Sequence, residues 1–340
     1  RNEDLRCCRI EHFQIGKTFE KWEEFRIMAG STLPLVTVEM LTYNKFQYIE
    51  DALNSVFMQD YPNIELIISD DGSKNFDRRY IERILTKRSN NIKEVKIIHH
   101  EQNLGTVRNL NGCIKASSGQ FFIGLSSDDI FKDSKVISDV VDYFLRTGAL
   151  IVTSKRALFN DDINHFEILP TDDDIRYLFN GKLYQRLVVG NFISGACTFY
   201  SKELFDKYGL FDEEYRLLED YPQYLRLARE GIPIHFYDRI TIYYRDGGIS
   251  SPITINQTLR KDFALTIKKE ILPYPDLISK DLYMYKHFEM ERLEGKSVLN
   301  PGLFARYPAI YLRKILSKVG LRKSDFEKFI ENLSDKERIE

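Results

Sequence analysis

The spacing of apolar residues between positions 35 and 154 changes repeatedly, and each change predicts a new element of secondary structure. Short apolar runs predict buried strands. Apolar residues three or four positions apart, such as Ile49, Leu53 and Val56, predict one buried face of a helix. The predicted strands cover residues 35–41, 63–73, 95–100, 120–129 and 149–154. The predicted helices cover residues 48–59, 77–88, 104–119 and 134–148.

Strands and helices alternate in this region with short connections, which predicts a doubly wound, mostly parallel α/β sheet with helices on both faces. In such sheets, ligands bind at the carboxyl ends of the strands. Three polar turns fall at such ends: "TYN" at 42–44, "DDGS" at 70–73 and "SSDD" at 126–129. We therefore expect these turns to form one site.

The pattern is less regular after residue 160. The predicted elements up to residue 246 are a strand, short helix and turn in 192–215, a helix in 218–231 that opens on acids, and two short strands in 232–246. Beyond them we predict helices in 255–295, a helix from Pro308 that ends at Gly320, and a last helix with a capping box from Ser324 to Glu327. We divide the chain into an N-terminal extension (1–33), a catalytic domain (34–255, with halves 34–155 and 156–255) and a helical C-terminal region (256–340).

Composition narrows the class of protein. The net charge of −2 indicates no nucleic-acid partner. The four cysteines, Cys7, Cys8, Cys113 and Cys197, fit neither a zinc site nor a disulfide framework, which favours a reducing compartment. No apolar run reaches the roughly 18 residues of a membrane span, and no signal-peptide core is visible. We expect a cytoplasmic protein, with peripheral contact at the inner face of the membrane left open.

Each acidic turn also has a structural explanation. Asp128 and Asp129 can cap the helix near residue 134, and Gly72 supports a simple turn after Asp70 and Asp71. Asp220 can serve as an N-cap. Only the combination of the turns in one order points to a function.

That order resembles glycosyltransferase family 2 over about residues 35–250. The segments that carry the resemblance are "VTVEMLTYNKFQYIEDALNSVFMQDYPNIELIISDDGS", "NLGTVRNLNGCIKASSGQFFIGLSSDDIF", "ISGACTFYSKELFDKYGLFDEEY" and "EDYPQYLRL". The resemblance implies the GT-A fold and inverting transfer of a sugar from a nucleoside-diphosphate sugar, with a UDP-sugar expected, to a glycan or lipid-linked acceptor.

The resemblance also assigns roles on the donor side. Asp128 is expected to bind Mn²⁺ or Mg²⁺, since hard cations prefer carboxylate oxygen and neutralise a diphosphate leaving group. Asp70 or Asp71 would accept from the uracil ring N–H, and Arg108 would contact the base or the diphosphate. The residues expected around the nucleotide sugar are Thr42, Tyr43, Asn44, Asp70, Asp71, Arg108, Ser127 and Arg245.

On the acceptor side, Asp220 matches the family's general base. An inverting transfer needs such a base to take the proton of the attacking hydroxyl. Glu219 would share in acceptor binding, and the small residues Gly195 and Ala196 would let backbone approach a sugar.

Two positions depart from the family pattern. Ser126 replaces the first acid of the metal turn, where a hydroxyl can still contact ribose but metal affinity is expected to be lower. Asp246 and Gly247 follow Arg245 where many relatives have a histidine, so a histidine ligand is missing there.

One other function remains an alternative, and a second one lacks its motif. A scaffold that has lost catalysis would explain Ser126. A nucleotidyltransferase needs a glycine-rich basic loop after the first strand, and "TYNKFQYIED" is not one. The C-terminal basic residues Arg313, Lys314 and Lys318 lie among apolar residues, which fits an interfacial helix on a membrane, packing on the catalytic domain, or a homodimer contact.

Overall fold

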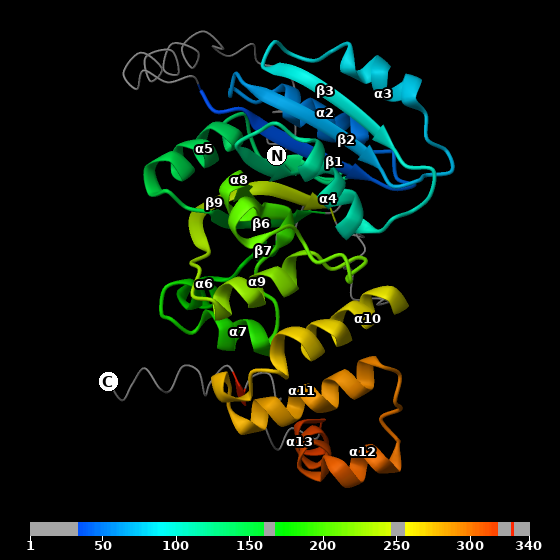
Figure 1. Ribbon diagram of the computed structural model, residues 1–340, viewed down its shortest axis with the longest axis vertical. Helices are drawn as coiled ribbons and strands as arrows, with labels where there is room; N and C mark the ends of the chain where they lie inside the picture. Colours follow the sequence, from blue (N-terminus) through cyan, green and yellow to red (C-terminus); the bar gives the residue numbers. More distant parts are fainter. Residues whose placement is uncertain (1–32, 160–166, 246–255, 319–327, 330–340) are drawn as a thin grey trace, which may run out of the picture.

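The structure is a computed structural model that describes residues 33–159, 167–245, 256–318 and 328–329. Within these ranges, nine strands form one sheet in the order β3-β2-β1-β4-β8-β6-β9-β5, with β7 paired to β6 (Figure 1). The strands are β1 (Val36–Thr42), β2 (Ile64–Asp70), β3 (Ile92–His99), β4 (Phe121–Gly124), β5 (Ile130–Phe131), β6 (Ile151–Phe159), β7 (Glu167–Leu169), β8 (Thr198–Ser201) and β9 (His235–Arg245). The predicted α/β class is confirmed.

The first half of the sheet is parallel. β1 pairs with β2 and with β4, and β2 pairs with β3, all in parallel. Every residue of β2 is buried, because helices cover both of its faces. The register places Thr42 beside Asp70 and Asp70 beside His99, so the carboxyl ends of three strands meet at one edge.

The second half of the sheet is mixed. β8 is antiparallel to both β4 and β6, and β9 is parallel to β6. The prediction of two short strands in 232–246 is wrong, because β9 is a single strand. Its pairing with β6 continues through a shift of register at Lys155. The alternation of apolar and polar residues in β9 is interrupted at this irregularity, but the strand does not end there.

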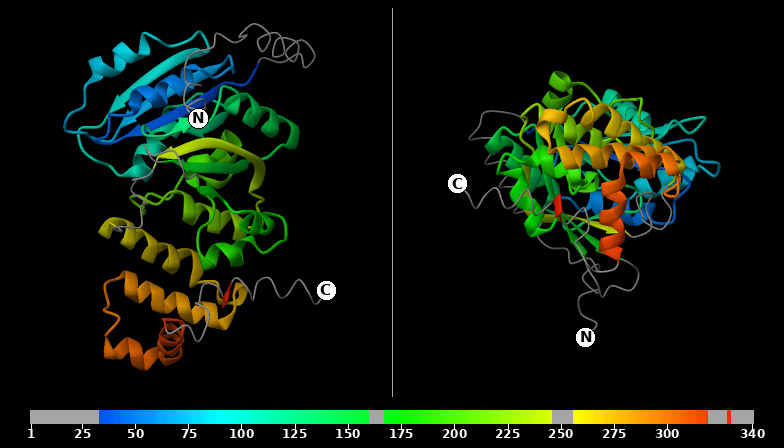
Figure 2. Two further views of the ribbon diagram at one scale, coloured as in Figure 1. Left: turned by 180° about the vertical axis from the view of Figure 1, so that it is seen from behind. Right: turned by 90° about the horizontal axis from the view of Figure 1, so that it is seen from below.

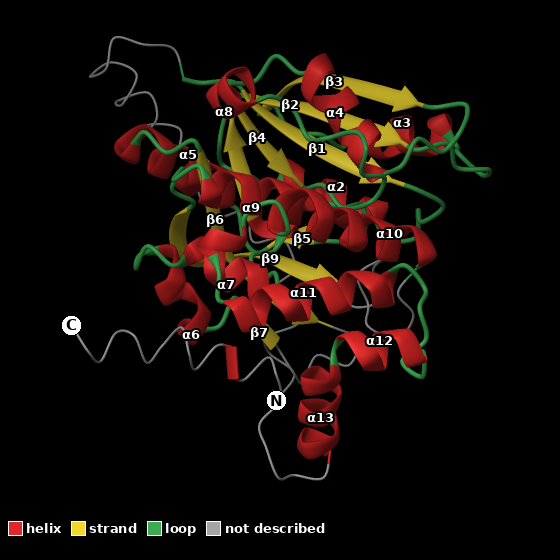
Figure 3. Ribbon diagram, turned by 60° about the horizontal axis from the view of Figure 1, so that its bottom comes forward, coloured by secondary structure: helices red, strands yellow, loops and turns green. Residues whose placement is uncertain are grey.

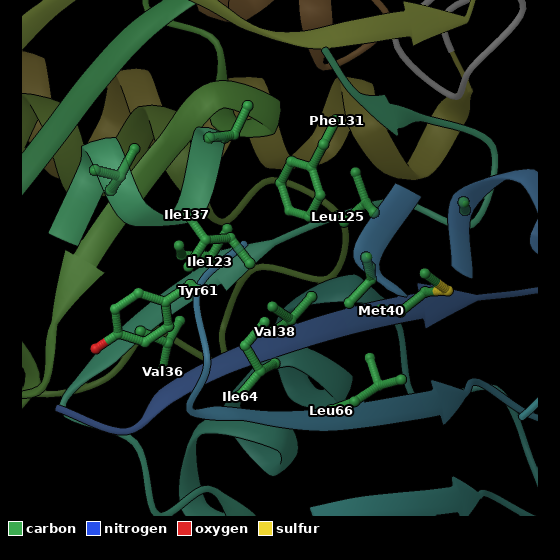
Figure 4. Packing of buried hydrophobic residues seen from close by; sticks show 14 of the residues in the cluster. Val36, Val38, Met40, Tyr61, Ile64, Leu66, Ile123, Leu125, Phe131 and Ile137 are labelled. Atoms are coloured by element: carbon green, nitrogen blue, oxygen red, sulfur yellow. The ribbon is translucent and has the colours of Figure 1, made fainter. Parts of the chain in front are cut away.

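Helices cover both faces. α2, α3 and α5 pack on one face of the sheet, and α4, α7, α8 and α9 pack on the other. Figure 4 shows the first of these cores, in which Val36, Val38 and Met40 of β1 meet Ile64 and Leu66 of β2. The helices of this part are α2 (Ile49–Phe57), α3 (Arg78–Leu85), α4 (Thr106–Ala116), α5 (Val136–Thr147), α6 (Asp172–Ile175), α7 (Leu183–Val189), α8 (Lys202–Tyr208) and α9 (Asp220–Arg229).

The C-terminal region is helical, as predicted. Figures 1 and 2 show its helices at the end of the molecule opposite β3. They are α10 (Gln257–Thr266, continued by a π turn at Ile267–Ile271), α11 (Lys280–Leu293), α12 (Pro301–Arg306) and α13 (Pro308–Lys318). Within the described ranges, none of the helices combines the length and the apolar character that a bilayer span requires.

Gly119 does not cap α4, although a glycine at the end of the predicted helix 104–119 is a common C-terminal cap. α4 ends at Ala116. Gly119 instead lies against β1, where a Cβ would come within 2.4 Å of Thr37 Oγ1. The glycine is required by this close approach of the backbone to the sheet.

Several sequence predictions lie outside the described residues. These are most of the N-terminal extension, the loop from Asp246, the helix end at Gly320 and the capping box from Ser324 to Glu327. Cys113 and Cys197 lie inside the described part and are buried free thiols.

Candidate active site

The "TYN" and "DDGS" turns are joined by hydrogen bonds. Asn44 adopts a left-handed conformation with φ of 55°, and its N–H donates to Ser73 Oγ at 2.7 Å. The Lys74 N–H donates to Asn44 Oδ1 at 3.3 Å. The neighbouring Tyr43 is 46% exposed. The two turns therefore form one surface at the strand ends, with an aromatic ring open to a ligand.

Asp70 is fully buried and holds this surface together. It accepts from the Ser73 N–H at 2.8 Å, from Ser73 Oγ at 2.5 Å and from His99 Nδ1 at 2.8 Å. The His99 ring stacks on Phe76, with centroids 4.3 Å apart. The Asp70 carboxylate therefore accepts its hydrogen bonds from the protein rather than from a ligand.

Asp71 anchors the loop before α4. It accepts from the Leu104 N–H at 2.7 Å, the Gly105 N–H at 3.0 Å and Asn103 Nδ2 at 2.8 Å. Burial raises the pKa of Asp71 despite these donors. A nucleobase N–H would have to share the Asp71 oxygens with this loop.

Arg108 lies on the exposed side of α4. Its Nε is 3.7 Å from Glu213 Oε2, and the side chain is more than half exposed. Its recorded partner is thus Glu213, which is not one of the residues predicted for the donor site.

The "SSDD" turn follows β4. Ser126 Oγ donates to Asp128 Oδ1 at 2.5 Å, and Lys45 Nζ lies 3.5 Å from Asp128 Oδ2. Ser127 is buried, and its hydroxyl donates to the Lys45 carbonyl at 3.4 Å. The segment after "TYN" therefore packs directly on the metal turn predicted at Asp128.

Asp129 and Arg245 connect this turn to the end of β9. The Arg245 N–H donates to Asp129 Oδ1 at 2.9 Å, and Arg245 Nε donates to the Asp128 carbonyl at 3.1 Å. The guanidinium also stacks on the rings of Tyr48 and Phe159, at 3.6 and 4.6 Å from their centroids. Asp129 is almost fully buried, and this burial raises its pKa to about 7.

The carboxylates of this turn fit a divalent cation as part of a ligand set. Asp128 retains about a sixth of its side-chain exposure, and Asp129 Oδ2 is buried without a hydrogen-bond partner in the described structure. Across the described ranges, no three His, Cys, Asp or Glu side chains are grouped to hold a metal. A hard cation there would need additional oxygen ligands from a diphosphate and water.

The acceptor-side residues meet at the start of α9. The N-cap is Glu219 rather than Asp220, which occupies the first helical position and accepts from the Tyr221 N–H at 2.6 Å. Gly195 lies against Asp220, because a Cβ on this glycine would be 3.1 Å from Asp220 Oδ2. Ala196 follows in the same 3-10 turn, Gly195–Cys197.

The carboxyl groups of Glu219 and Asp220 are neighbours, and both are partly buried. Burial and the charge of Asp220 raise the pKa of Glu219, while burial raises the pKa of Asp220 against the N–H groups of Tyr221 and Gly195, which lower it. Two adjacent carboxyls do not readily ionise together, and the N–H donors favour ionised Asp220. Asp220 is suited to accept a proton.

The two sides of the site leave the sheet at neighbouring positions. β8 is antiparallel to β4, with Phe199 beside Ile123, so the turn that precedes β8 lies next to the turn that follows β4. The first of these turns carries Gly195 and contacts Asp220, and the second carries Asp128. The sheet therefore brings the turn predicted to bind a cation and the carboxylate predicted to accept a proton to one edge.

Three residues around the site were missed from the sequence. Lys45 and Tyr48 contact the turn and Arg245 respectively, and their position directly after "TYN" was the available signal. Glu39 lies inside β1, 3% exposed, with Oε2 lacking a partner in the described structure, and its burial raises its pKa to about 8. A single acid in an apolar strand pattern was the signal for Glu39.

Comparison with known proteins follows the same outline. The family model described as glycosyl transferase family 2 matches residues 37–209, just over half of the 340 residues. An uncharacterised glycosyltransferase of Haemophilus influenzae is 25% identical over 250 residues, 71% of this chain and 74% of the relative. The putative colanic acid biosynthesis glycosyl transferase WcaA of Escherichia coli is 28% identical over 209 residues, 58% of this chain and 67% of WcaA. The chain spans only 34% of the length of matched relatives from Rickettsia conorii and Rickettsia felis.

A solved structure shares the fold. Residues 1–349 of Staphylococcus aureus TarS, crystallised with UDP-GlcNAc, superpose with a TM-score of 0.55 at 18% identity, covering 88% of this chain and 80% of that chain. At this identity the likeness extends to the GT-A architecture alone.

Proposed function

The chain belongs to glycosyl transferase family 2 and is a glycosyltransferase, and we propose that it moves a sugar from a nucleoside-diphosphate sugar to a hydroxyl of a glycan or lipid-linked acceptor. We propose a UDP-sugar as the donor. The transfer would invert the anomeric configuration and would be assisted by a metal ion. The observation that carries this proposal is the contact of Gly195 with Asp220, beside the turn of Asp128. The similarity to WcaA and to TarS with UDP-GlcNAc supports a saccharide setting and a UDP donor.

The donor would lie along the strand ends. Tyr43 offers an exposed ring for the nucleobase. Asp71 offers carboxylate oxygens that also accept hydrogen bonds from the N–H groups of residues 104 and 105. Asp128, supported by Asp129, would hold Mn²⁺ or Mg²⁺. When bound, such a cation stabilises the charge that develops on the departing diphosphate. Thr42, Asn44, Ser127 and Arg245 would contribute by fixing the backbone around the donor.

Asp220 would take the proton of the acceptor hydroxyl as that oxygen attacks the anomeric carbon. The bond between the anomeric carbon and the diphosphate oxygen breaks on the opposite face, which inverts the configuration. Neutral Glu219 would donate a hydrogen bond to another acceptor hydroxyl, and the small side chains of Gly195 and Ala196 would leave room for the sugar.

A donor screen tests this proposal. Common sugar nucleotides are incubated with the chain and Mn²⁺, and released UDP or GDP is measured. The proposal predicts release from one donor class, loss of that release with EDTA, and its loss in Asp220→Asn with unchanged UDP binding by calorimetry. UDP binding without turnover of any donor would instead favour a binding protein, for which the Ser126–Asp128 hydrogen bond is the supporting observation.

A further inference from the structure

Five exposed apolar side chains lie close together on the C-terminal helices and the loop before them. We call the set Val298, Leu299, Phe304, Leu312 and Ile315 the apolar patch. Twelve large apolar side chains are exposed in the described structure, and these five fall within 18 residues. Leu299 is 87% exposed and Phe304 is 56% exposed. A cluster of this kind marks an interaction surface more often than scattered single residues do.

The patch is firmly attached to the rest of the region. On their inner side, α12 and α13 contribute Leu303, Tyr307 and Ile310 to a small core around Phe288 of α11. On the outer side, the Phe304 ring lies 5.4 Å from the Tyr311 ring, and Tyr311 Oη donates to the Val298 carbonyl at 2.6 Å. These contacts join the loop at Val298, α12 and α13 into one unit, and Figure 3 shows α13 projecting from the body of the molecule.

The segment that carries the patch is strongly basic. Residues 295–318 contain no Asp or Glu and five basic residues, in a chain whose net charge is −2. Those basic residues are Lys296, Arg306, Arg313, Lys314 and Lys318. Lys296 and Arg306 both contact one carboxylate, Glu291, at 2.5 Å, which leaves that trio net positive. Arg313 is buried and pairs with Asp281 at 3.5 Å, and Lys314 Nζ lies over the rings of Tyr285 and Phe288. Three of these cations thus contact two carboxylates, which leaves the segment with an excess of positive charge.

This charge decides between the candidate occupants. A second copy of the chain docked by two-fold symmetry would bring one basic segment against another, which is unfavourable. An anionic lipid surface accepts apolar side chains below its headgroups and attracts Lys and Arg at the same level. We propose that the apolar patch, together with the excess positive charge of its segment, binds the surface of an anionic membrane.

The dimensions fit a helix that lies on a membrane. α13 has 11 residues, about half of what a bilayer span needs. Phe304, Leu312 and Ile315 would enter the boundary between headgroups and acyl chains. This inference goes beyond the transfer reaction and does not depend on it.

Vesicle flotation of the full chain tests the inference without donor or acceptor. Vesicles of equal parts phosphatidylcholine and phosphatidylglycerol should bind the chain, and phosphatidylcholine vesicles should bind it at least about tenfold more weakly, since each cation near an anionic surface contributes about fivefold. The triple variant F304S/L312S/I315S should lose at least about tenfold in binding to the mixed vesicles. Added salt should also weaken binding.

The matched control is Phe179→Ser, which removes a more exposed ring, 68% against 56% for Phe304, from another part of the molecule. It should bind like the unchanged chain. Thermal unfolding of both variants should match the original, because all four side chains are exposed. Equal binding to the two vesicle types, equal binding by the triple variant, or a dimer in sedimentation that the triple variant abolishes would each overturn the proposal.

Discussion

The contact between Gly195 and Asp220 allows a small substitution to move the proposed base without removing it. In Gly195→Ala, the new Cβ would lie 3.1 Å from Asp220 Oδ2 and 3.3 Å from Asp220 Cβ. Ordinary contact begins near 3.4 Å, so the carboxylate must shift by at least about 0.3 Å. Gly195 has no left-handed φ, so alanine adds crowding but no backbone strain.

The expected effect follows from how steeply catalysis depends on geometry. A displacement of about 1 Å costs about a hundredfold, so a shift of about 0.3 Å should lower kcat by about fourfold. The crowding should also lower the free energy of unfolding by about 1 kcal/mol. Steady-state release of nucleoside diphosphate with the donor found in the screen measures kcat, and urea unfolding measures stability.

Gly112→Ala is the matched control for this substitution. It makes the same chemical change within α4, where no atom lies within 4 Å of the new Cβ. It should leave kcat unchanged and raise stability by about 0.5–1 kcal/mol, as expected for replacing a helical glycine. If Gly195→Ala retained the full kcat of Gly112→Ala, the position of the Asp220 carboxylate would not limit the reaction, and its assignment as base would be refuted.

Three further predictions concern the acids of the site. Asp220→Asn should lower kcat by about 10²–10⁴-fold with UDP affinity unchanged, and an active variant with a normal melting curve would rule out the base role. Asp128→Ala should abolish the stimulation of the rate by Mn²⁺, whereas Ser126→Asp should lower the Mn²⁺ concentration that gives half of the maximal rate. Titration of the rate with Mn²⁺ measures both effects. An unchanged titration in Asp128→Ala would contradict the metal assignment. Glu39 is an acid whose pKa burial raises from 4.5 to about 8, so the folded state holds a proton that the unfolded state releases between these pH values, and stability falls as pH rises through that window. Glu39→Gln should remove this dependence of the free energy of unfolding on pH, which amounts to at most about 1.4 kcal/mol per pH unit. Urea unfolding of both proteins at pH 5 and pH 8 measures it. If the substitution changed the free energy of unfolding by the same amount at both pH values, Glu39 would not titrate in this window.

The sequence predicted the parts of the fold that depend on local pattern. The apolar runs gave β1 and β2 and the helices between strands, and the strand-end rule placed Thr42 and Asp70 at one edge, as their register confirms. The acidic pair at the start of α9 was also visible as sequence.

Contacts between distant segments could not be predicted in the same way. Asp71 binds residues 103–105 and Asp129 binds Arg245, and both pairings depend on how loops far apart in the chain meet. The continuity of β9 is a further example, since β9 stays paired with β6 on both sides of the irregular register at Lys155. The resemblance suggested that Asp70 or Asp71 would accept from a nucleobase, whereas the protein donors to both side chains appear only in three dimensions.

Arg245 makes the acidic turn and the end of β9 one mechanical unit. Its main chain binds Asp129, its side chain binds the Asp128 carbonyl, and its guanidinium is clamped between two aromatic rings. Any ligand that favours one arrangement of the turn must therefore favour one position of Arg245 by the same free energy, and the reverse holds equally. A substitution of Phe159, whose ring packs on the guanidinium, is therefore expected to alter the affinity of the acidic turn for its ligand.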